Sequence, residues 1–283
     1  MMRFDSKCRL LGLWRWLAGL ALLIAAAAPA LHAADDPNDF DSYKVRIYGF
    51  WFYSNPTGTI QGSTETGRID LQKDLGFNNY STFAGKIDWK FTRKNHLYFV
   101  GSSFDQTRTS TLSRTIVFQG QIFDVGLVTK AQLSAPMFAP GYQYDIIRRK
   151  RGHLGIGFQI NLFDTSASLN AAAQVTSDGV QHAAVSAKGS LLAPIPVAGP
   201  QFRFYLTNSP RVFVEGNLYG MYLFGYGNFV STADNIGVTL NKHVSLNAGY
   251  QLGSRLVVNN KNADRIGIHL TQKGPIAGLE VSF

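Results

Sequence analysis

Alternation of apolar and polar residues is the feature that most constrains how this chain can fold. In residues 82–91 the odd positions carry apolar or aromatic side chains or glycine, and the even positions carry polar or small ones. The same alternation recurs in residues 153–162, 201–207 and 244–253. A period of two is typical of a β-strand whose two faces meet different surroundings. The pattern therefore predicts an all-β protein.

The composition favours lipid over water as the surroundings of the apolar face. Charged residues make up 16% of the chain and aromatic residues 13%, whereas soluble domains average about 25% charged residues. After residue 33 no apolar run approaches the ~18 residues that indicate a transmembrane helix. A closed β-barrel can span a bilayer because it satisfies every backbone hydrogen bond internally. We therefore predict a transmembrane antiparallel β-barrel, with its apolar face toward lipid and its polar face toward the lumen.

Turn and loop lengths predict ten strands. Such barrels have short turns on the periplasmic side and longer loops outside. Tight connections lie at residues 92–95, 149–152, 208–210 and 241–243. Longer polar segments lie at residues 54–79, 107–121, 164–197, 224–228 and 258–262. The strands predicted between them are residues 43–53, 80–91, 95–106, 122–148, 153–163, 198–207, 211–223, 229–240, 243–257 and 263–283.

Two proline-containing segments leave an alternative of twelve strands. Proline cannot donate a hydrogen bond to a sheet, so we interpret Gly274-Pro275 as a bulge within the last strand. If Gly274-Pro275 is instead a turn, and Ser134-Ala135-Pro136 is another, the count becomes twelve. Both predicted strands that contain these segments exceed the roughly 10 residues needed to cross a bilayer. They should therefore project beyond the membrane.

The N-terminal region has the order of features of a cleaved secretory signal peptide. Basic residues from Arg3 to Arg15 precede an apolar run, and a small-residue site follows, which predicts cleavage after Ala33. Cys8 is the only cysteine and precedes the apolar run, so the mature chain is expected to contain no thiol. We expect residues 34–42 to be a solvated periplasmic tail and residues 43–283 to form the barrel.

The C-terminal tail carries a resemblance to a known class of proteins. The odd positions from Ala277 to Phe283 are apolar or aromatic, and the last residue is phenylalanine. Together with the signal peptide, this tail resembles the closing strand of bacterial outer-membrane β-barrel proteins. The resemblance implies Sec-type export to the outer membrane and recognition of Phe283 by the barrel assembly machinery. It also implies periplasmic chaperones, outer-membrane lipid and lipopolysaccharide as partners.

The surplus of basic residues does not predict a nucleic-acid partner. Removing residues 1–33 takes four basic residues and one acidic residue from totals of 27 and 18, which leaves a net charge of +6. No basic helix or aromatic-basic repeat accompanies this charge. The densest basic run, Arg148 to Arg151, is interpreted as a solvated periplasmic turn. Its alternative role, a clamp for lipopolysaccharide phosphates, would require this turn to lie outside the cell.

Charged residues on the polar faces of the strands predict a network in the lumen. The interior of a barrel of about eight to ten strands is narrow enough for side chains to fill, and unpaired charges there are unfavourable. We therefore expect a paired network that fills the lumen, and as the alternative a narrow polar path for small solutes. The predicted members are Arg46, Lys86, Asp88, Lys90, Asp145, Arg203, Glu215, Arg265 and Glu280. The predicted aromatic residues at the membrane interfaces are Tyr43, Trp89, Phe91, Tyr142, Tyr144 and Phe283.

One short motif raises the possibility of catalysis. His243 and Ser245 share a strand face, and His243-Val244-Ser245 resembles the His-x-Ser element of the outer-membrane lipid A deacylase family, whose third member is a glutamate. No carboxylate follows on that strand, and the turn pattern places His243 on the periplasmic side. The other histidines form no His-x-His or His-Glu-x-x-His pattern, so no metal or cofactor is predicted.

These patterns favour a non-enzymatic outer-membrane barrel, either structural or a narrow passive pore for small polar solutes. The first alternative is a lipid A-modifying hydrolase that uses His243 and Ser245. The second is a surface-binding barrel that attaches to a partner through residues 54–79 and 164–197.

Overall fold

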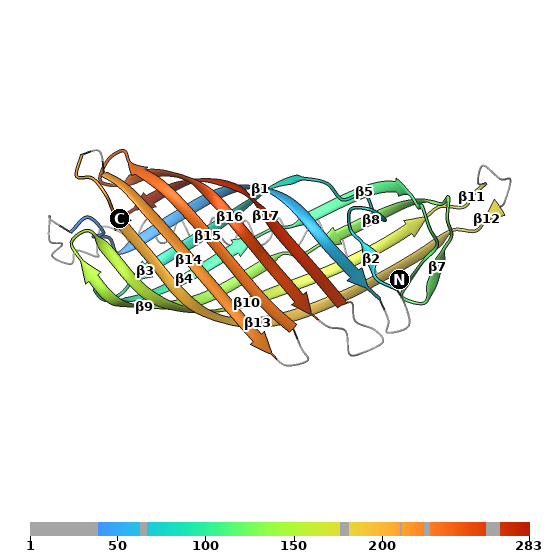
Figure 1. Ribbon diagram of the computed structural model, residues 1–283, viewed down its shortest axis with the longest axis horizontal. Helices are drawn as coiled ribbons and strands as arrows, with labels where there is room; N and C mark the ends of the chain where they lie inside the picture. The colour runs from blue at the N-terminus through green and yellow to red at the C-terminus, as the bar shows by residue number, and fades with distance from the viewer. Residues whose placement is uncertain (1–38, 63–66, 176–180, 210, 224–226, 259–266) are drawn as a thin grey trace.

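The computed structural model describes residues 39–62, 67–175, 181–209, 211–223, 227–258 and 267–283. They form a closed, antiparallel, ten-stranded barrel (Figure 1). The wall consists of β1 (Val45–Gln61), β3 (Tyr80–Lys90), β4 (Asn95–Ser102), β9 (Met137–Arg149), β10 (Gly152–Ala171), β13 (Val185–Tyr205), β14 (Arg211–Leu223), β15 (Gly227–Thr239), β16 (Val244–Val258) and β17 (Gly267–Ser282). Each strand pairs with the next wall strand, and β17 pairs with β1 to close the barrel.

Shorter strands lie toward the end of the barrel that carries the long connections (Figure 1). They are β2 (Ile69–Asp70), β5 (Asp105–Thr111), β6 (Ile116–Phe118), β7 (Gln121–Phe123), β8 (Val128–Ser134), β11 (Gln174–Val175) and β12 (Gln181–His182). We call this the wide-loop end and the opposite end the short-turn end. The described part of the chain contains no helix of the length and apolarity needed to cross a membrane.

The prediction of ten strands is confirmed, and the alternative of twelve is wrong. β17 runs without interruption through Gly274-Pro275. β8 and β9 both pair with β10, so Ala135-Pro136 joins two parts of one wall segment rather than forming a turn. The predicted bulge lies on the neighbouring strand: the register of β16 against β17 shifts between Gln251 and Ser254.

Gly274 allows β1 and β17 to approach closely. A Cβ atom at this position would lie 1.8 Å from the carbonyl oxygen of Tyr53 on β1. Glycine therefore keeps the pairing of β1 with β17 in register beside the bulge.

Two strands are much longer than predicted. β10 and β13 pair over twenty residues, from Gly152 opposite Phe204 to Ala171 opposite Val185. Most of the predicted loop at residues 164–197 is therefore strand, because small and apolar inward residues such as Ala167 and Leu169 continue the alternation. Twenty residues extend about 65 Å, which exceeds the ~30 Å hydrocarbon core even with a tilt of about 45°. This pair must project beyond the bilayer at the wide-loop end.

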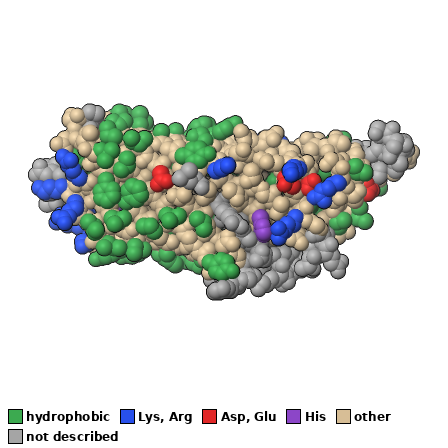
Figure 2. Space-filling model, in the orientation of Figure 1, with side chains coloured by type: hydrophobic (Ala, Val, Ile, Leu, Met, Phe, Trp, Pro, Cys, Tyr) green, Lys and Arg blue, Asp and Glu red, His purple; other side chains and the backbone are tan. Residues whose placement is uncertain are grey.

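The two faces of the strands differ as predicted. The apolar face is exposed on the outside, as Phe83 (59%), Ile156 (52%) and Leu279 (47%) show. Apolar side chains gather mainly over the half of the barrel nearer the short turns, and Lys and Arg cluster at that end (Figure 2). Of the predicted interfacial aromatic residues, all but one are exposed. The exception is Tyr43, for which the prediction is wrong, because its ring is buried in the lumen.

The interior of the wide-loop end is an apolar core. Two connections fold inward there, residues 69–77 after β1 and residues 112–127 with the β6–β7 hairpin, and we call them the cap. Their buried side chains pack on inward residues of the wall strands; the buried cap residues are Ile69, Leu71, Leu75, Phe77, Leu112, Ile116, Phe118, Phe123 and Leu127. The two cap segments are joined by an ion pair between Arg114 and Asp74, with nitrogen–oxygen distances of 2.6 and 2.9 Å. The prediction of loosely arranged polar loops at residues 54–79 and 107–121 missed this core.

We expect Gly274→Ala to destabilise the barrel by about 1–3 kcal/mol, the usual range for inserting a methyl group into a packed site. The reason is the overlap of the new Cβ with the Tyr53 carbonyl oxygen. Gly49→Ala on β1 is the matched control, because nothing lies within 4 Å of a Cβ there. Urea unfolding in detergent micelles measures both variants, and equal stabilities would contradict the prediction.

The orientation of the barrel follows from its connections, since short turns lie on the periplasmic side of such barrels. We expect a cysteine at Lys150 in the β9–β10 turn to be protected from a membrane-impermeant maleimide on intact cells. A cysteine at Lys73, an exposed residue of the cap, should react. Both should react after the outer membrane is permeabilised, and the reverse pattern on intact cells would invert the orientation.

Candidate functional site

The segment before β1 enters the lumen at the short-turn end. Phe40 donates its backbone N–H to the Lys150 carbonyl oxygen at 2.9 Å, and its ring packs edge-to-face on Tyr205 at 5.8 Å between centroids. These contacts direct Asp41 and Tyr43 inward, and both are buried. The prediction that this segment is solvated is therefore wrong for Asp41.

Asp41 is the centre of a buried network of charges. Its carboxylate lies 2.8 Å from Arg46, 3.4 Å from Lys90 and 2.8 Å from the His153 Nδ1 atom. Arg148 completes the shell at 3.4 Å. Burial alone would raise the pKa of Asp41, but the charges of Lys90, Arg46 and His153 outweigh it and hold this pKa well below its ordinary value.

A second carboxylate links strands on either side of the barrel closure. Glu280 on β17 lies 3.1 Å from Arg46 on β1. It also accepts two hydrogen bonds from Arg203 on β13, at 2.7 and 3.0 Å, a bidentate geometry that fixes the guanidinium plane. Arg203 lies 3.1 Å from Glu215 on β14 and stacks over the Phe213 ring at 3.6 Å. Four wall strands are thereby joined across the lumen.

A third group surrounds a buried histidine. The two ring nitrogens of His96 on β4 lie 3.1 Å from Asp88 on β3 and 3.1 Å from Asp145 on β9. Tyr43 donates its hydroxyl to Asp88 at 3.1 Å, and Gln143 donates its amide to Asp145 at 2.8 Å. Each carboxylate thus has at least two hydrogen-bonding partners, as a buried charge requires.

The structure brings together eight of the nine residues that were predicted to form the lumen network. Arg46, Asp88, Lys90, Asp145, Arg203, Glu215 and Glu280 make the contacts described above. Lys86 lies 3.8 Å from Asp88. Arg265 lies outside the described residues.

Sequence reasoning missed five members of this network: Asp41, Tyr43, His96, Arg148 and His153. The alternation could have identified His96 and His153, since both occupy inward positions of their strands. Arg148 was assigned to a solvated turn, yet its side chain is only 8% exposed and pairs with Asp39, whereas Arg149, Lys150 and Arg151 are exposed. No periodic signal identifies Asp41, which precedes the first predicted strand, and Tyr43 was placed in that strand although β1 begins only at Val45.

The candidate catalytic pair is not assembled. His243 is exposed and packs against Phe283, and its Nδ1 atom lies 2.8 Å from the Ser282 carbonyl oxygen. Ser245 is buried in the lumen and donates its hydroxyl to Thr239 at 3.2 Å. The two side chains therefore bond to different partners, His243 exposed at the turn before β16 and Ser245 buried in the lumen. Within the described ranges, no group of three or more His, Cys, Asp or Glu residues is arranged to hold a metal ion.

A cavity of about 290 Å³ lies in the lumen between the charge network and the cap. Its wall at the short-turn end includes Arg46, Asp88 and Arg203, and its wall at the wide-loop end includes Phe104 and Leu133. The cavity is therefore amphipathic along the barrel axis.

Comparison with known proteins supports the fold and does not indicate a function. No family model matches the chain, and no curated protein matches its sequence. Among solved structures, the outer membrane protease OmpT from Escherichia coli aligns with a TM-score of 0.56 and 12% identity, over 86% of this chain and 98% of that one. The translocator domain of the autotransporter NalP from Neisseria meningitidis aligns with a TM-score of 0.40 and 10% identity, over 99% and 100%. The likeness to OmpT shows that this chain has the fold of a bacterial outer-membrane β-barrel.

We expect Asp41→Asn to destabilise the barrel by about 3–5 kcal/mol, because it leaves buried cations without their counter-charge. Asp105→Asn, at an exposed position, should change stability by at most about 0.5 kcal/mol. Denaturant unfolding in detergent micelles measures the difference.

The wild-type protein and Asp41→Asn also test how the contribution of Asp41 to stability depends on pH. The folded-state pKa of Asp41 is depressed, so its contribution is fully present above the ordinary value of 3.8 and is lost only as the pH falls through the folded pKa. The stability gap between wild type and Asp41→Asn should therefore not shrink between neutral pH and 3.8. A gap that closes near pH 6 would show that Asp41 is not the source of the stabilisation.

Proposed function

We propose that this protein is a non-enzymatic outer-membrane barrel with a closed lumen, and that its role is structural rather than that of an open pore. The network around Asp41 is the observation that carries the proposal. Asp41, Asp145, Arg203 and Glu280 are each at most 1% exposed. Charges that line a water-filled channel keep their hydration, whereas these are packed as in a protein core.

The two ends of the lumen would be closed by different means. At the short-turn end, the segment that contains Asp41 occupies the interior and is held by ion pairs from β1, β3, β9 and β10. At the wide-loop end, the apolar cap fills the space between the projecting strands. Passage of a polar solute would require disruption of both regions.

The alternatives receive less support from the geometry. A hydrolase that uses His243 and Ser245 would need the two side chains bonded to each other with an acid beside them, and instead they bond to Ser282 and Thr239. A surface-binding role was inferred for loops at residues 54–79 and 164–197, much of which is built into strands and the cap. We propose outer-membrane lipid and lipopolysaccharide as the neighbours of the exposed apolar band.

Conductance in planar lipid bilayers tests the closed lumen. We expect the wild-type protein to give no stepwise conductance at neutral pH. A variant lacking residues 34–42, and a second in which residues 113–126 are replaced by a short glycine turn, should each remain silent because one closure is intact. A variant with both changes should conduct.

Correct insertion of every variant is checked by its heat-modifiable migration on gels. Regular conductance steps from the wild-type protein would reject the closed lumen and assign the narrow polar pore instead.

A further inference from the structure

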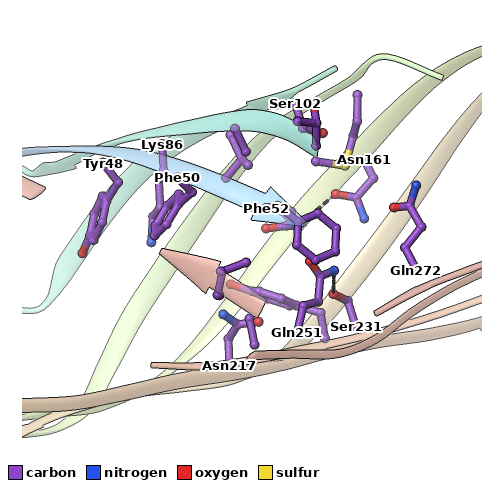
Figure 3. Close-up of a pocket in the computed structure, with 18 of the residues that line it drawn as sticks. Tyr48, Phe50, Phe52, Lys86, Ser102, Asn161, Asn217, Ser231, Gln251 and Gln272 are labelled. Carbon is purple, nitrogen blue, oxygen red and sulfur yellow. Dashed lines mark hydrogen bonds between the residues drawn. The ribbon is translucent and has the colours of Figure 1, made fainter. Parts of the chain in front are cut away.

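The lumen cavity has the walls of a small-molecule site. Figure 3 shows Phe50 and Phe52 of β1 projecting into it, together with polar side chains from β10, β14, β15 and β17. Further rings, those of Tyr80, Phe104, Phe163, Tyr219 and Phe229, also line it. An apolar wall with a few converging polar groups is the usual make-up of a ligand pocket.

Several buried polar atoms in this wall lack a hydrogen-bonding partner among the described residues, and Asn161 carries one of them. Asn161 on β10 is fully buried, and its side-chain oxygen accepts a hydrogen bond from Gln159 at 2.7 Å. With the Asn161 oxygen engaged by Gln159, the Nδ2 donor is left without a partner among the described residues. The hydroxyl of Thr165, on the same face of β10, is also buried and unpartnered. A buried donor that lacks an acceptor is unfavourable, so this wall favours a molecule that supplies one.

A cation lies on another part of the wall. Lys86 of β3 projects into the cavity (Figure 3), with its Nζ atom 4.8 Å from the centroid of the Tyr98 ring. Its nearest carboxylate, Asp88, lies at 3.8 Å and is already bonded to His96 and Tyr43. The charge of Lys86 is therefore only partly compensated, and a negatively charged ligand would complete it.

We propose that this cavity binds a small aromatic molecule that carries a carboxylate. The aromatic side chains named above contact the apolar body of this molecule. The Asn161 amide donates a hydrogen bond to a carboxylate oxygen, and Lys86 supplies the compensating positive charge. A volume of about 290 Å³ corresponds to about ten water molecules. It suits a ligand of about ten non-hydrogen atoms, the size of a substituted benzoate. Water alone satisfies the polar groups but leaves the aromatic wall hydrated.

The probe for this site is 4-fluorobenzoate, observed by ¹⁹F NMR with the full-length mature barrel refolded in detergent micelles in its presence. We expect saturable binding with one site per barrel. Asn161→Leu, which removes the donor with little change in volume, should weaken binding at least tenfold, as expected for loss of a hydrogen bond to a charged group. Asn170→Leu is the matched control, because Asn170 lies on the same strand but is exposed, and it should bind as the wild type does.

Three further measurements keep the test decisive if Asn161→Leu folds poorly. Asn161→Asp places a carboxylate where the amide donated and should also abolish binding, and Ser231→Phe should do so by filling the cavity. Fluorobenzene, which lacks the acceptor, should bind at least tenfold more weakly than 4-fluorobenzoate. Partitioning of 4-fluorobenzoate that is the same for all variants and for empty micelles would overturn the proposal and leave ordered water as the occupant. Either result is independent of whether the barrel conducts.

Discussion

The rest of this structure depends on one constraint, the need to pair every backbone N–H and C=O group where no water is present to do so. Pairing of β17 with β1 meets this need by closing the sheet, so that no strand edge faces lipid. Closure with ten strands in turn defines a narrow interior, which inward side chains must fill. Space is limited where β1 and β17 meet. At position 274 only glycine fits, because a Cβ atom there would overlap the Tyr53 carbonyl oxygen.

Within that interior, charge and hydrophobicity are separated along the axis. Ion pairs around Asp41, Glu280 and His96 occupy the short-turn end, and each joins side chains from several strands. Buried charges add little net stability compared with apolar packing, but removing one partner leaves an uncompensated charge. Such a network therefore specifies one arrangement of the wall. The cap at the other end achieves closure by apolar burial, and the cavity lies where the two kinds of packing meet.

Local patterns predicted the wall because the environment of each strand residue depends on its parity. Phe83 faces out and Lys86 faces in for the same reason, that successive side chains point to opposite faces. The odd or even position of a residue along its strand also predicted most of the lumen network, because a charge that faces inward in a narrow barrel needs a partner. Strand position could not identify the partner of each charge. Arg203 and Glu280, for example, are far apart in the chain and meet only across the closed sheet.

The sequence by itself determined the class of fold, favoured ten strands over twelve, and indicated the side of the wall on which most strand residues lie and the positions of the short turns. Only the tertiary structure decided what fills the barrel. Asp41 and the cap residues belong to segments without periodicity, and Tyr43 lies just before β1, so their positions depend on which space the closed wall leaves and on the charges already inside it. The separation of His243 from Ser245 was decided in the same way, by hydrogen bonds to Ser282 and Thr239 that no local pattern encodes.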